Sequence, residues 1–389
     1  MRRIFMQVYC RYPHGGASSN YLENLAKMFK SAGYSVILIS DMNKEYSTSD
    51  KEHFGFFDRV YSIEYSTNEK ERARQREQGF AKERIGILQD EGITSNDIVF
   101  TYLILNTQML DRLFQYRDEI GFKVIAGVTE FYNRGEEVSD LQYEMRKRAR
   151  EIFAEKADAV LTVSDFIRKY YVERGVSAFR IPPVIDCSKL EKIEKSISIK
   201  KFIISTGKDS FFNMLKAFEK LTPEELGVIE IHICGVKEEI LRKTLDCCDY
   251  EKILPYMVVH KWLRYEELEA LYKEMHFLLI AREKCQRTIA NFPSKVPEMM
   301  AYGVVPIASD VGDYTKYYLE DGKNSIFIQG DSVEEIVKSI RKAIYLSEES
   351  YNQYSDAAME CARNRFDYHN WKEDIRSRIE KICCQENEI

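Results

Sequence analysis

A chain of 389 residues is too long for one ordinary hydrophobic core, so its length predicts two domains of roughly 180 residues each. Its composition, with 44% hydrophobic and 31% charged residues, is typical of a packed globular protein and excludes a disordered or fibrous one. The net charge of −6 argues against a protein that binds nucleic acid, and no stretch approaches the roughly 18 apolar residues that a membrane span needs.

The cysteines and the N-terminal residues favour a cytoplasmic protein without a metal site. The nine cysteines are scattered, and the adjacent pairs Cys247–Cys248 and Cys383–Cys384 lack C-x-x-C spacing. This pattern is typical of free thiols in a reducing compartment. The first residues are basic, but the apolar run after them is short and indicates a first strand, so no signal peptide is expected.

The first half of the chain, residues 1–186, alternates strand and helix patterns. Strands are predicted at residues 4–9, 35–40, 60–63, 98–102, 123–127 and 159–163. Helices are predicted at about residues 19–32, 68–91, 107–120 and 139–156. Because runs rich in Val, Ile and Leu are followed by helices, we expect a parallel sheet that is covered on both faces.

The second half repeats this alternation. The charged residues 187–200 follow Ile181-Pro182-Pro183 and have little apolar periodicity, which predicts a linker. Strands are then predicted at residues 202–205, 228–234, 257–259, 277–280, 304–308 and 325–328. Helices are predicted at about residues 209–221, 237–246, 265–274, 294–302, 313–319, 333–346, 348–364 and 366–382.

These patterns predict an α/β protein with two Rossmann-like, doubly wound parallel-sheet domains, residues 1–186 and 201–364. Ligands of such sheets bind beyond the carboxyl ends of the strands. Two such domains that face each other would therefore form one cleft.

The loop after the first strand is one candidate ligand site. Gly15 and Gly16 would let backbone N–H groups approach a phosphate at the start of the next helix, and His14 lies in the same loop. An ordinary strand-to-helix turn is the alternative. The loop lacks the G-x-G-x-x-G pattern, which argues against a nicotinamide cofactor.

Three charged residues follow predicted strands. Lys208 follows the first strand of the second half and could contact a diphosphate as a point charge, although it could equally be a solvated loop lysine. Arg282 follows the strand at 277–280, and it or Arg287 could neutralise a departing diphosphate. Glu130 follows the strand at 123–127, and a solvated loop carboxylate is the alternative there.

The segment 292–307, FPSKVPEMMAYGVVPI, is the most informative motif. Ser294 is expected to cap a helix that Gly303 ends, with a buried strand after it. Glu298 would then lie near the carboxyl end of a strand, where a carboxylate can accept the two hydroxyls of a ribose. Lys295 lies three residues earlier on the same helical face. The alternative is an acid that only stabilises a helix start.

The longer run FPSKVPEMMAYGVVPIASDVGDYTKYYLEDGKNSIFI resembles the donor-site segment of GT-B glycosyltransferases, close to glycosyltransferase family 4. Matching positions are Pro293, Ser294, Lys295, Glu298, Gly303, Pro306, Gly312, Asp313 and Asp321-Gly322. GVTEFYN resembles a motif of capsule- and exopolysaccharide-type members. Residues 363–371 resemble the helix that crosses back onto the first domain, so residues 365–389 are expected to pack there.

The resemblance implies a nucleotide-diphosphate sugar, for which we expect a UDP-sugar, and an acceptor hydroxyl on a glycan, a lipid-linked or a protein-linked molecule. It implies that the second domain holds the donor and the first domain the acceptor. Glu298 and the neighbouring Ser294 and Lys295 would line the donor site, with Glu298 at the ribose. Lys208 and Arg282 would contact the diphosphate, and Gly15 and Gly16 would face it across the cleft. No tightly bound cofactor and no metal ion are implied.

One departure from the family pattern concerns the reaction itself. Many members have a second glutamate eight positions before Glu298, where this chain has Ala290. The resemblance implies retention of configuration, with the donor phosphate assisting the acceptor. An inverting reaction would instead need a general base, for which His14 and Glu130 are the candidates.

Alternatives to sugar transfer remain open at this point. The same fold could epimerise a sugar nucleotide, or the chain could be a non-catalytic partner of an active transferase. The basic run Arg146–Arg150 could contact the inner face of a membrane that carries a lipid-linked acceptor, although such a run is also typical of a solvated helix face.

Overall fold

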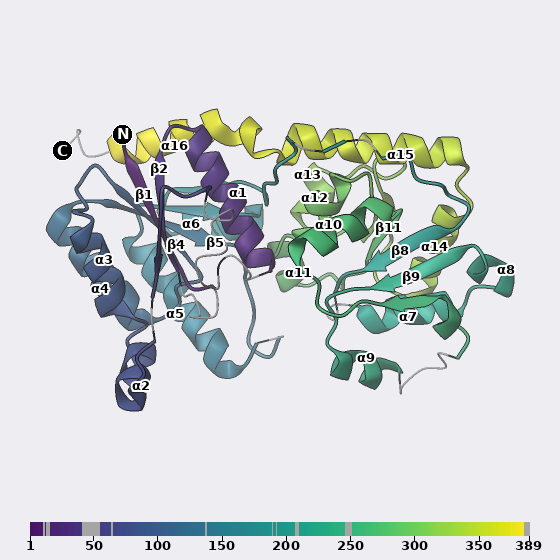
Figure 1. Cartoon of the computed structure of the whole chain (residues 1–389), viewed down its shortest axis with the longest axis horizontal. Coiled ribbons are helices and arrows are strands. Elements are labelled where there is room, and N and C mark those ends of the chain that lie inside the picture. Colours follow the sequence, from purple (N-terminus) through teal and green to yellow (C-terminus); the bar gives the residue numbers. More distant parts are fainter. Residues whose placement is uncertain are drawn as a thin grey trace. The chain divides into compact units, whose positions relative to one another are not determined.

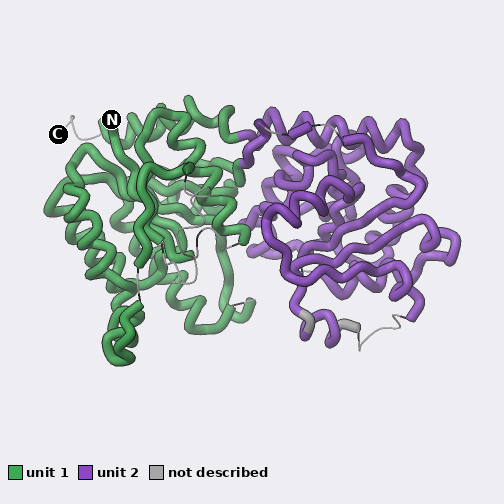
Figure 2. The backbone as a smooth tube through the Cα atoms, viewed as in Figure 1, with its two compact units in different colours: residues 1–184, 368–389 green, residues 185–367 purple. Residues whose placement is uncertain are grey.

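A computed structural model of the chain describes residues 1–10, 12, 16–40, 55–63, 65–136, 138–188, 190–191, 193–206, 210–245 and 251–384. The chain divides into two compact units (Figure 2). Unit 1 contains residues 1–184 and 368–389, and unit 2 contains residues 185–367. Residues 187–200, for which the sequence predicts a linker, belong to unit 2.

Unit 1 is built on a parallel sheet (Figure 1). Among the described residues its strand order is β3-β2-β1-β4-β5-β6-β7. The strands are β1 (Arg3–Val8), β2 (Ser35–Ser40), β3 (Arg59–Ser62), β4 (Ile98–Tyr102), β5 (Lys123–Val128), β6 (Ala159–Thr162) and β7 (Ala178–Arg180). The central strands β4 and β5 are buried along their whole length, because helices cover both faces of the sheet.

The helices α2, α4, α5 and α6 of unit 1 each begin at a side chain that accepts a free backbone N–H. Asn106 accepts the backbone N–H of Met109, and Ser139 forms a capping box with Gln142. The helices are α1 (Ala17–Ser31), α2 (Glu69–Glu77), α3 (Ala81–Asp90), α4 (Thr107–Ile120), α5 (Asp140–Lys156), α6 (Asp165–Val172) and α16 (Lys372–Cys384). A short 3-10 turn, Tyr368–Trp371, precedes α16.

The C-terminal helix α16 is part of unit 1, where it lies beside α1 (Figure 1). Arg376 Nε donates to the carbonyl oxygen of Ala32, which follows α1, at 3.0 Å. Ile375 and Ile379 are fully buried on the inner face of α16. Apolar burial and this hydrogen bond therefore attach the end of the chain to its first helix.

Unit 2 contains a second parallel sheet, with the order β10-β9-β8-β11-β12-β13 among the described residues. Its strands are β8 (Lys200–Ile204), β9 (Ile229–Ile233), β10 (Met257–Val259), β11 (Phe277–Ile280), β12 (Val305–Ser309) and β13 (Ile326–Ile328). Its helices are α7 (Phe211–Glu219), α8 (Pro223–Leu226), α9 (Glu238–Leu245), α10 (Tyr265–Glu274), α11 (Gln286–Ala290), α12 (Lys295–Met300), α13 (Asp313–Tyr317), α14 (Val333–Ile344) and α15 (Glu348–Cys361).

The prediction of two Rossmann-like parallel-sheet domains is confirmed. Four of the predicted strands, at residues 35–40, 98–102, 257–259 and 277–280, have the bounds that the structure shows. The helix predicted at 68–91 is instead two helices, because Phe80 takes a left-handed conformation with φ 57° between α2 and α3. Among the described residues, no helix is long and apolar enough to cross a membrane.

Gly303 ends the segment that contains α12, in a left-handed conformation with φ 70°. A Cβ atom at this position would collide with Ser355 Oγ, which donates a hydrogen bond to the Gly303 carbonyl oxygen at 2.8 Å. Gly322 has a similar φ of 80°, but the nearest atom to its Cβ position, Tyr354 Oη, is 4.0 Å away. A side chain at either position would strain the backbone, but only one at Gly303 would also collide with a neighbouring atom. A comparison of the two substitutions therefore distinguishes these two effects.

We expect Gly303→Ala to destabilise unit 2 more than Gly322→Ala. The left-handed backbone alone costs roughly 1–2 kcal/mol in either variant. Gly303→Ala must also displace Ser355, which costs roughly 1–2 kcal/mol more through overpacking and a lost hydrogen bond. Urea unfolding of both variants measures the difference, and equal losses would contradict the predicted collision.

Lys195 anchors the segment before β8 inside unit 2. Its Nζ donates to the carbonyl oxygens of Met275, at 2.6 Å, and Tyr302, at 2.8 Å. Burial lowers the pKa of Lys195 to about 7. In the unfolded chain this amine keeps the ordinary pKa of about 10.4, so the native state binds fewer protons than the unfolded state between these two values.

Because of Lys195, the free energy of unfolding should rise as the pH increases from about 7 towards 10. Lys195→Met should remove this contribution and flatten the pH dependence relative to the unsubstituted protein. Urea unfolding monitored by circular dichroism at several pH values measures it, with the exposed Lys338→Met as the control. Identical pH profiles for Lys195→Met and the parent would contradict the prediction.

Candidate functional site

The carboxyl edge of the second sheet carries the residues that the sequence singles out in unit 2. Ligands of parallel α/β sheets bind at this edge, because the loops there are the polar, accessible part of a sheet that is buried on both faces. Arg282 follows β11, and α12 carries Lys295 and Glu298 in the connection between β11 and β12. All three residues therefore belong to one loop and helix region of unit 2.

The short helix α12 begins as the sequence predicts, but not with the expected cap. Ser294 occupies the position before the helix, yet its own backbone is already helical (φ −58°, ψ −22°) and its hydroxyl makes no capping hydrogen bond. Glu298 lies in the first turn and is only 9% exposed. The helix is held by apolar burial instead, since Val296, Met299 and Met300 are fully buried.

Glu298 is paired inside unit 2. Lys295 Nζ lies 3.1 Å from Glu298 Oε2, and it also donates to the Tyr272 hydroxyl on α10 at 3.1 Å. The Lys295 side chain is 23% exposed and that of Glu298 is 10% exposed. The contact joins α10 to α12 and holds the carboxylate in a fixed place.

The surroundings in this cluster stabilise the charged form of Lys295 and the neutral form of Tyr272. Burial lowers the pKa of Lys295, but the neighbouring Glu298 carboxylate and Tyr272 outweigh this effect and raise it above its ordinary value. Burial raises the pKa of Tyr272 to about 12. Lys295 is therefore an ammonium and Tyr272 a neutral phenol at neutral pH.

Arg282 is fixed at the end of β11 and is only 5% exposed. Its backbone N–H donates to Ser309 Oγ at 2.9 Å, and its Nη1 donates to the Asn291 carbonyl oxygen at 2.9 Å. Asn291 lies three residues before Ser294, so the guanidinium is tied to the loop that leads into α12. A held positive charge of this kind can stabilise an anionic ligand without reorganisation.

The loop after β8 is described only in part. Lys208 lies outside the described residues, as do its neighbours Gly207 and Asp209. Ser210, at the start of α7, donates from Oγ to Asp331 Oδ2 at 2.6 Å, and its N–H donates to the Ala281 carbonyl oxygen at 3.3 Å. The second bond connects the start of α7 to Ala281, the residue that precedes Arg282.

The helix α11, which the sequence pattern does not predict, carries Ala290 at its end. Thr288 stabilises this short helix, since its Oγ1 accepts the Cys285 N–H at 3.0 Å and donates to the Glu283 carbonyl oxygen at 2.6 Å. Ala290 is completely buried. The position where the resemblance leads one to expect a glutamate is therefore a buried alanine in this chain.

In unit 1, Glu130 lies beyond β5 and forms an ion pair with α5. Arg146 Nη1 lies 2.7 Å from Glu130 Oε2, and the Glu130 side chain is 36% exposed. Both residues line a small cavity with Thr129 and Arg150. Arg150 is 6% exposed and its guanidinium lies over the Phe131 ring, 4.2 Å from the centroid.

The remaining predicted residues belong to the loop after β1. His14 and Gly15 lie outside the described residues. Gly16 precedes α1 with φ 65°, and no atom lies within 4 Å of the position that a Cβ would occupy. Across the part of the chain that the structure describes, no group of three His, Cys, Asp or Glu side chains is arranged to hold a metal ion.

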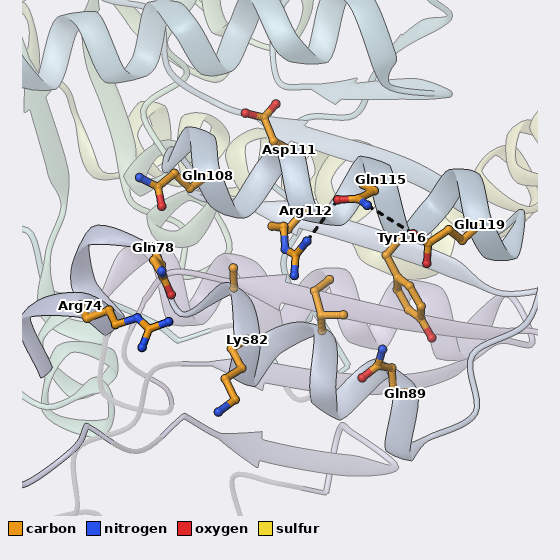
Figure 3. Close-up of a pocket in the computed structure, with 12 residues that line it drawn as sticks. Arg74, Gln78, Lys82, Gln89, Gln108, Asp111, Arg112, Gln115, Tyr116 and Glu119 are labelled. Atoms are coloured by element: carbon orange, nitrogen blue, oxygen red, sulfur yellow. Dashed lines mark hydrogen bonds between the residues drawn. The ribbon is translucent and has the colours of Figure 1, made fainter. Parts of the chain in front are cut away.

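A larger hollow in unit 1 lies elsewhere. It measures about 640 Å³ and lies between α3 and α4, with residues at the end of α2 (Figure 3). Its lining is polar, and Arg112, Gln115 and Glu119 form a hydrogen-bonded row along α4. None of the predicted site residues lines it, so it adds nothing to the candidate site.

The sequence of unit 2 matches a known family over most of its length. Residues 195–360 match the family described as glycosyl transferases group 1. The chain contains a group 1 glycosyltransferase domain. It is therefore an enzyme of the glycosyltransferase class, and the matched segment includes Lys195, Arg282, Lys295 and Glu298. No curated protein matches the sequence significantly.

Solved structures with the GT-B fold resemble the glycosyltransferase along its whole length. Sucrose-phosphate synthase from Thermosynechococcus elongatus is 13% identical with a TM-score of 0.73, and the match covers 99% of each chain. HepE from Anabaena in complex with UDP-glucose is 11% identical with a TM-score of 0.73, and the match covers 97% of this chain and 99% of HepE. A glycosyltransferase from Rickettsia africae is 14% identical with a TM-score of 0.69, at 98% and 99% coverage. At these identities the likeness shows the fold.

We expect Lys295 and Glu298 to be energetically coupled in the ligand-free glycosyltransferase. Lys295→Met or Glu298→Gln alone should destabilise the protein by roughly 1–3 kcal/mol, because the partner is left buried without its counter-charge. The double variant should lose less than the sum of the two, by roughly 1 kcal/mol. Urea unfolding of the four proteins measures this coupling.

The pair Glu320 and Lys323 is a matched control for this cycle. It has the same sequence spacing and the same 3.1 Å distance, but its side chains are 61% and 64% exposed. Solvent screening should leave this pair with little coupling. Equal coupling in the two pairs would show that burial does not strengthen the Lys295–Glu298 contact.

Proposed function

We propose that the protein transfers a sugar from a nucleotide-diphosphate sugar, namely a UDP-sugar, to an acceptor hydroxyl. The acceptor is a glycan, a lipid-linked or a protein-linked molecule. Unit 2 binds the donor at the carboxyl edge of its sheet, and unit 1 binds the acceptor. The group 1 match of residues 195–360 supports the reaction class, and the similarity to HepE, which was solved in complex with UDP-glucose, supports the choice of donor.

The observation that carries the proposal is the buried and oriented carboxylate of Glu298. An acid whose only role is to stabilise a helix start can remain solvated, whereas Glu298 is 9% exposed and held by Lys295. A fixed carboxylate can accept hydrogen bonds from the two adjacent hydroxyls of a ribose. Lys295 keeps the local charge close to neutral, so that the carboxylate does not repel the nearby diphosphate.

Arg282 and Lys208 carry the electrostatic part of the reaction. In the transfer step the acceptor oxygen forms a bond to C1 of the sugar, and the bond from C1 to the diphosphate oxygen breaks. The leaving nucleoside diphosphate gains negative charge, which a fixed guanidinium and an ammonium can stabilise. The bonds from Arg282 to Asn291 and Ser309 hold it at the end of β11 for this role.

The stereochemical course that we propose is retention, without a metal ion and without a covalent intermediate on the protein. A phosphate oxygen of the donor then accepts the proton of the acceptor hydroxyl. Glu130 and His14 are the candidates for a general base if the reaction inverts. The ion pair with Arg146 favours a structural or acceptor-binding role for Glu130, because its carboxylate is already engaged at 2.7 Å.

We also propose a peripheral membrane contact through the basic run on α5. Only a small part of this run is exposed and can support the proposal. Arg146 and Arg150 point towards the interior of unit 1, since they line a cavity, whereas Lys147 and Arg148 are exposed. Two exposed cations on the same helix as the apolar and exposed Leu141 could approach an anionic headgroup. A lipid-linked acceptor would bring the protein to such a surface.

One observation favours a second function, that of a non-catalytic partner of an active transferase. The completely buried Ala290 replaces a carboxylate that the resemblance associates with the transferred sugar. A chain that binds the donor but neither transfers nor hydrolyses the sugar, with many acceptors tested, would support this alternative. Release of UDP that depends on an added acceptor would exclude it.

Glu298→Ala should abolish most of the thermal stabilisation that a nucleoside diphosphate confers. A ligand that binds only the folded state raises the unfolding midpoint. At a ligand concentration of 100 times the dissociation constant, the free energy of unfolding increases by about 2.7 kcal/mol. We expect UDP to stabilise the unsubstituted protein and Glu298→Ala to lose that shift. Differential scanning fluorimetry with UDP, GDP, ADP and TDP measures it.

The exposed glutamate Glu349, in the first turn of α15, supplies the matched control. Glu349→Ala removes the same charge at a helix start and should keep the full shift. If Glu298→Ala retained the shift as well, Glu298 would not belong to the donor site.

A further inference from the structure

Unit 2 exposes a tryptophan at the sheet edge that carries the candidate donor site. Trp262 is 69% exposed and lies in the loop between β10 and α10. The sequence contains only two tryptophans. An indole is a large apolar surface, so a solvated one on the functional edge of a sheet is a candidate contact for a ligand.

The backbone places this indole next to the end of β9. The N–H of His260 donates to the carbonyl oxygen of Ile233 at 2.9 Å, which continues the pairing of β10 with β9 to the last residue of β9. Trp262 follows two residues later, within about 7 Å of His260 along the chain. The indole therefore starts from the carboxyl edge of β9 and β10.

The Lys295–Glu298 pair lies beside the same strand end. Cys234 directly follows β9, and the Lys295 ammonium opposes the rise that burial causes in the pKa of the Cys234 thiol. Cys234 also belongs to the same buried cluster as Tyr272, whose hydroxyl accepts a hydrogen bond from Lys295. Tyr272, which contacts Lys295, lies on α10, the helix that Trp262 precedes. Trp262 and Glu298 thus lie in connections that leave the same, carboxyl edge of the sheet.

The loop that carries Trp262 is held at both ends. His260 is tied to β9 through its ring as well, because its Nε2 lies 2.9 Å from His232 Nδ1. On the other side, the Arg264 N–H donates to Glu267 Oε2 at 2.7 Å and starts α10. Leu263 packs against the apolar core of unit 2. The contacts of these neighbouring residues thus hold the backbone at Trp262 in place while its side chain stays exposed to solvent.

We propose that Trp262 is the platform on which the nucleobase of the donor stacks. The inference rests on the proposed function, which places the ribose at Glu298. A base attached to that ribose needs an apolar surface within a few ångströms of the sugar, and a flat aromatic ring supplies it. Stacking of a base on an aromatic side chain contributes about 1–3 kcal/mol, which corresponds to roughly 5- to 150-fold in affinity.

This platform has a consequence for specificity. Stacking uses the face of the base, which all nucleobases have, and leaves the hydrogen-bonding edge unread. Trp262 therefore increases the affinity for the nucleotide without choosing between uracil and other bases. The choice must be made by other groups around the edge of the base.

Calorimetric titration with UDP separates the contribution of the base from that of the remainder of the nucleotide. Trp262→Ala should weaken UDP binding roughly 5- to 150-fold, whereas Trp262→Phe should keep most of the affinity. Ribose 5-phosphate and pyrophosphate, which both lack the base, should bind the unsubstituted protein and Trp262→Ala equally well. Leu254→Ala is the matched control, because Leu254 is a 49% exposed apolar residue just before β10, at its opposite end.

Tryptophan fluorescence gives a second, direct readout. In a Trp371→Phe background Trp262 is the remaining indole, so its emission should change saturably with UDP, at the dissociation constant that calorimetry gives. The base-free ligands should leave the emission unchanged. Because Trp262 is mostly exposed, its substitution should not alter the unfolding midpoint, and a comparison of midpoints checks this.

The outcomes separate the inference from the proposed function. If UDP binds the unsubstituted protein and Trp262→Ala binds it equally well, the platform proposal is wrong and the exposed indole belongs to another kind of surface. An emission that does not respond to bound UDP would overturn it as well. If neither UDP, GDP, ADP nor TDP binds the unsubstituted protein, the proposed function fails, and the platform proposal fails with it.

Discussion

Both sheets of this protein are covered by helices on their two faces, and this constraint determines where chemistry can occur. A strand such as β4 or β11 is buried along its whole length, and most of its side chains are apolar. Polar groups that a ligand could use are confined to the loops at the strand ends. The Lys295–Glu298 pair and Arg282 lie in such loops, and each is held by hydrogen bonds or an ion pair within unit 2. Rigid placement is what makes charged residues useful at a site of this kind.

Most of the fold could be predicted from the sequence because its central elements carry strong local signals. Short runs rich in β-branched and aromatic residues, such as residues 35–40 and 98–102, favour a buried strand. The short elements α8, α11 and β7 were missed, since three to five residues carry too little periodicity and depend on their surroundings. The division of the helix at 68–91 escaped prediction for a related reason, because Phe80 is not a residue type that favours a left-handed conformation.

The candidate site was predictable to a smaller extent. The spacing of Lys295 and Glu298 places them on one face of a helix, and the structure pairs them at 3.1 Å. Their contact with Tyr272 could not be predicted, because it joins side chains 23 positions apart in the sequence. The cap expected at Ser294 does not form, since its backbone is already helical. The roles of Lys208, His14 and Gly15 stay predictions, as these residues lie outside the described part of the chain.

The assignment of α16 to unit 1 has a consequence for biosynthesis. Unit 2 is encoded between two parts of unit 1, so a ribosome must complete all of residues 185–367 before it can deliver α16 to its place against α1. Until then the apolar surface that Ile375 and Ile379 cover in the native state is open to water and to other nascent chains. A nascent chain should therefore need a chaperone mainly to cover the apolar surface of α1. This need should last until α16 has been synthesised, long after α1 has left the exit tunnel.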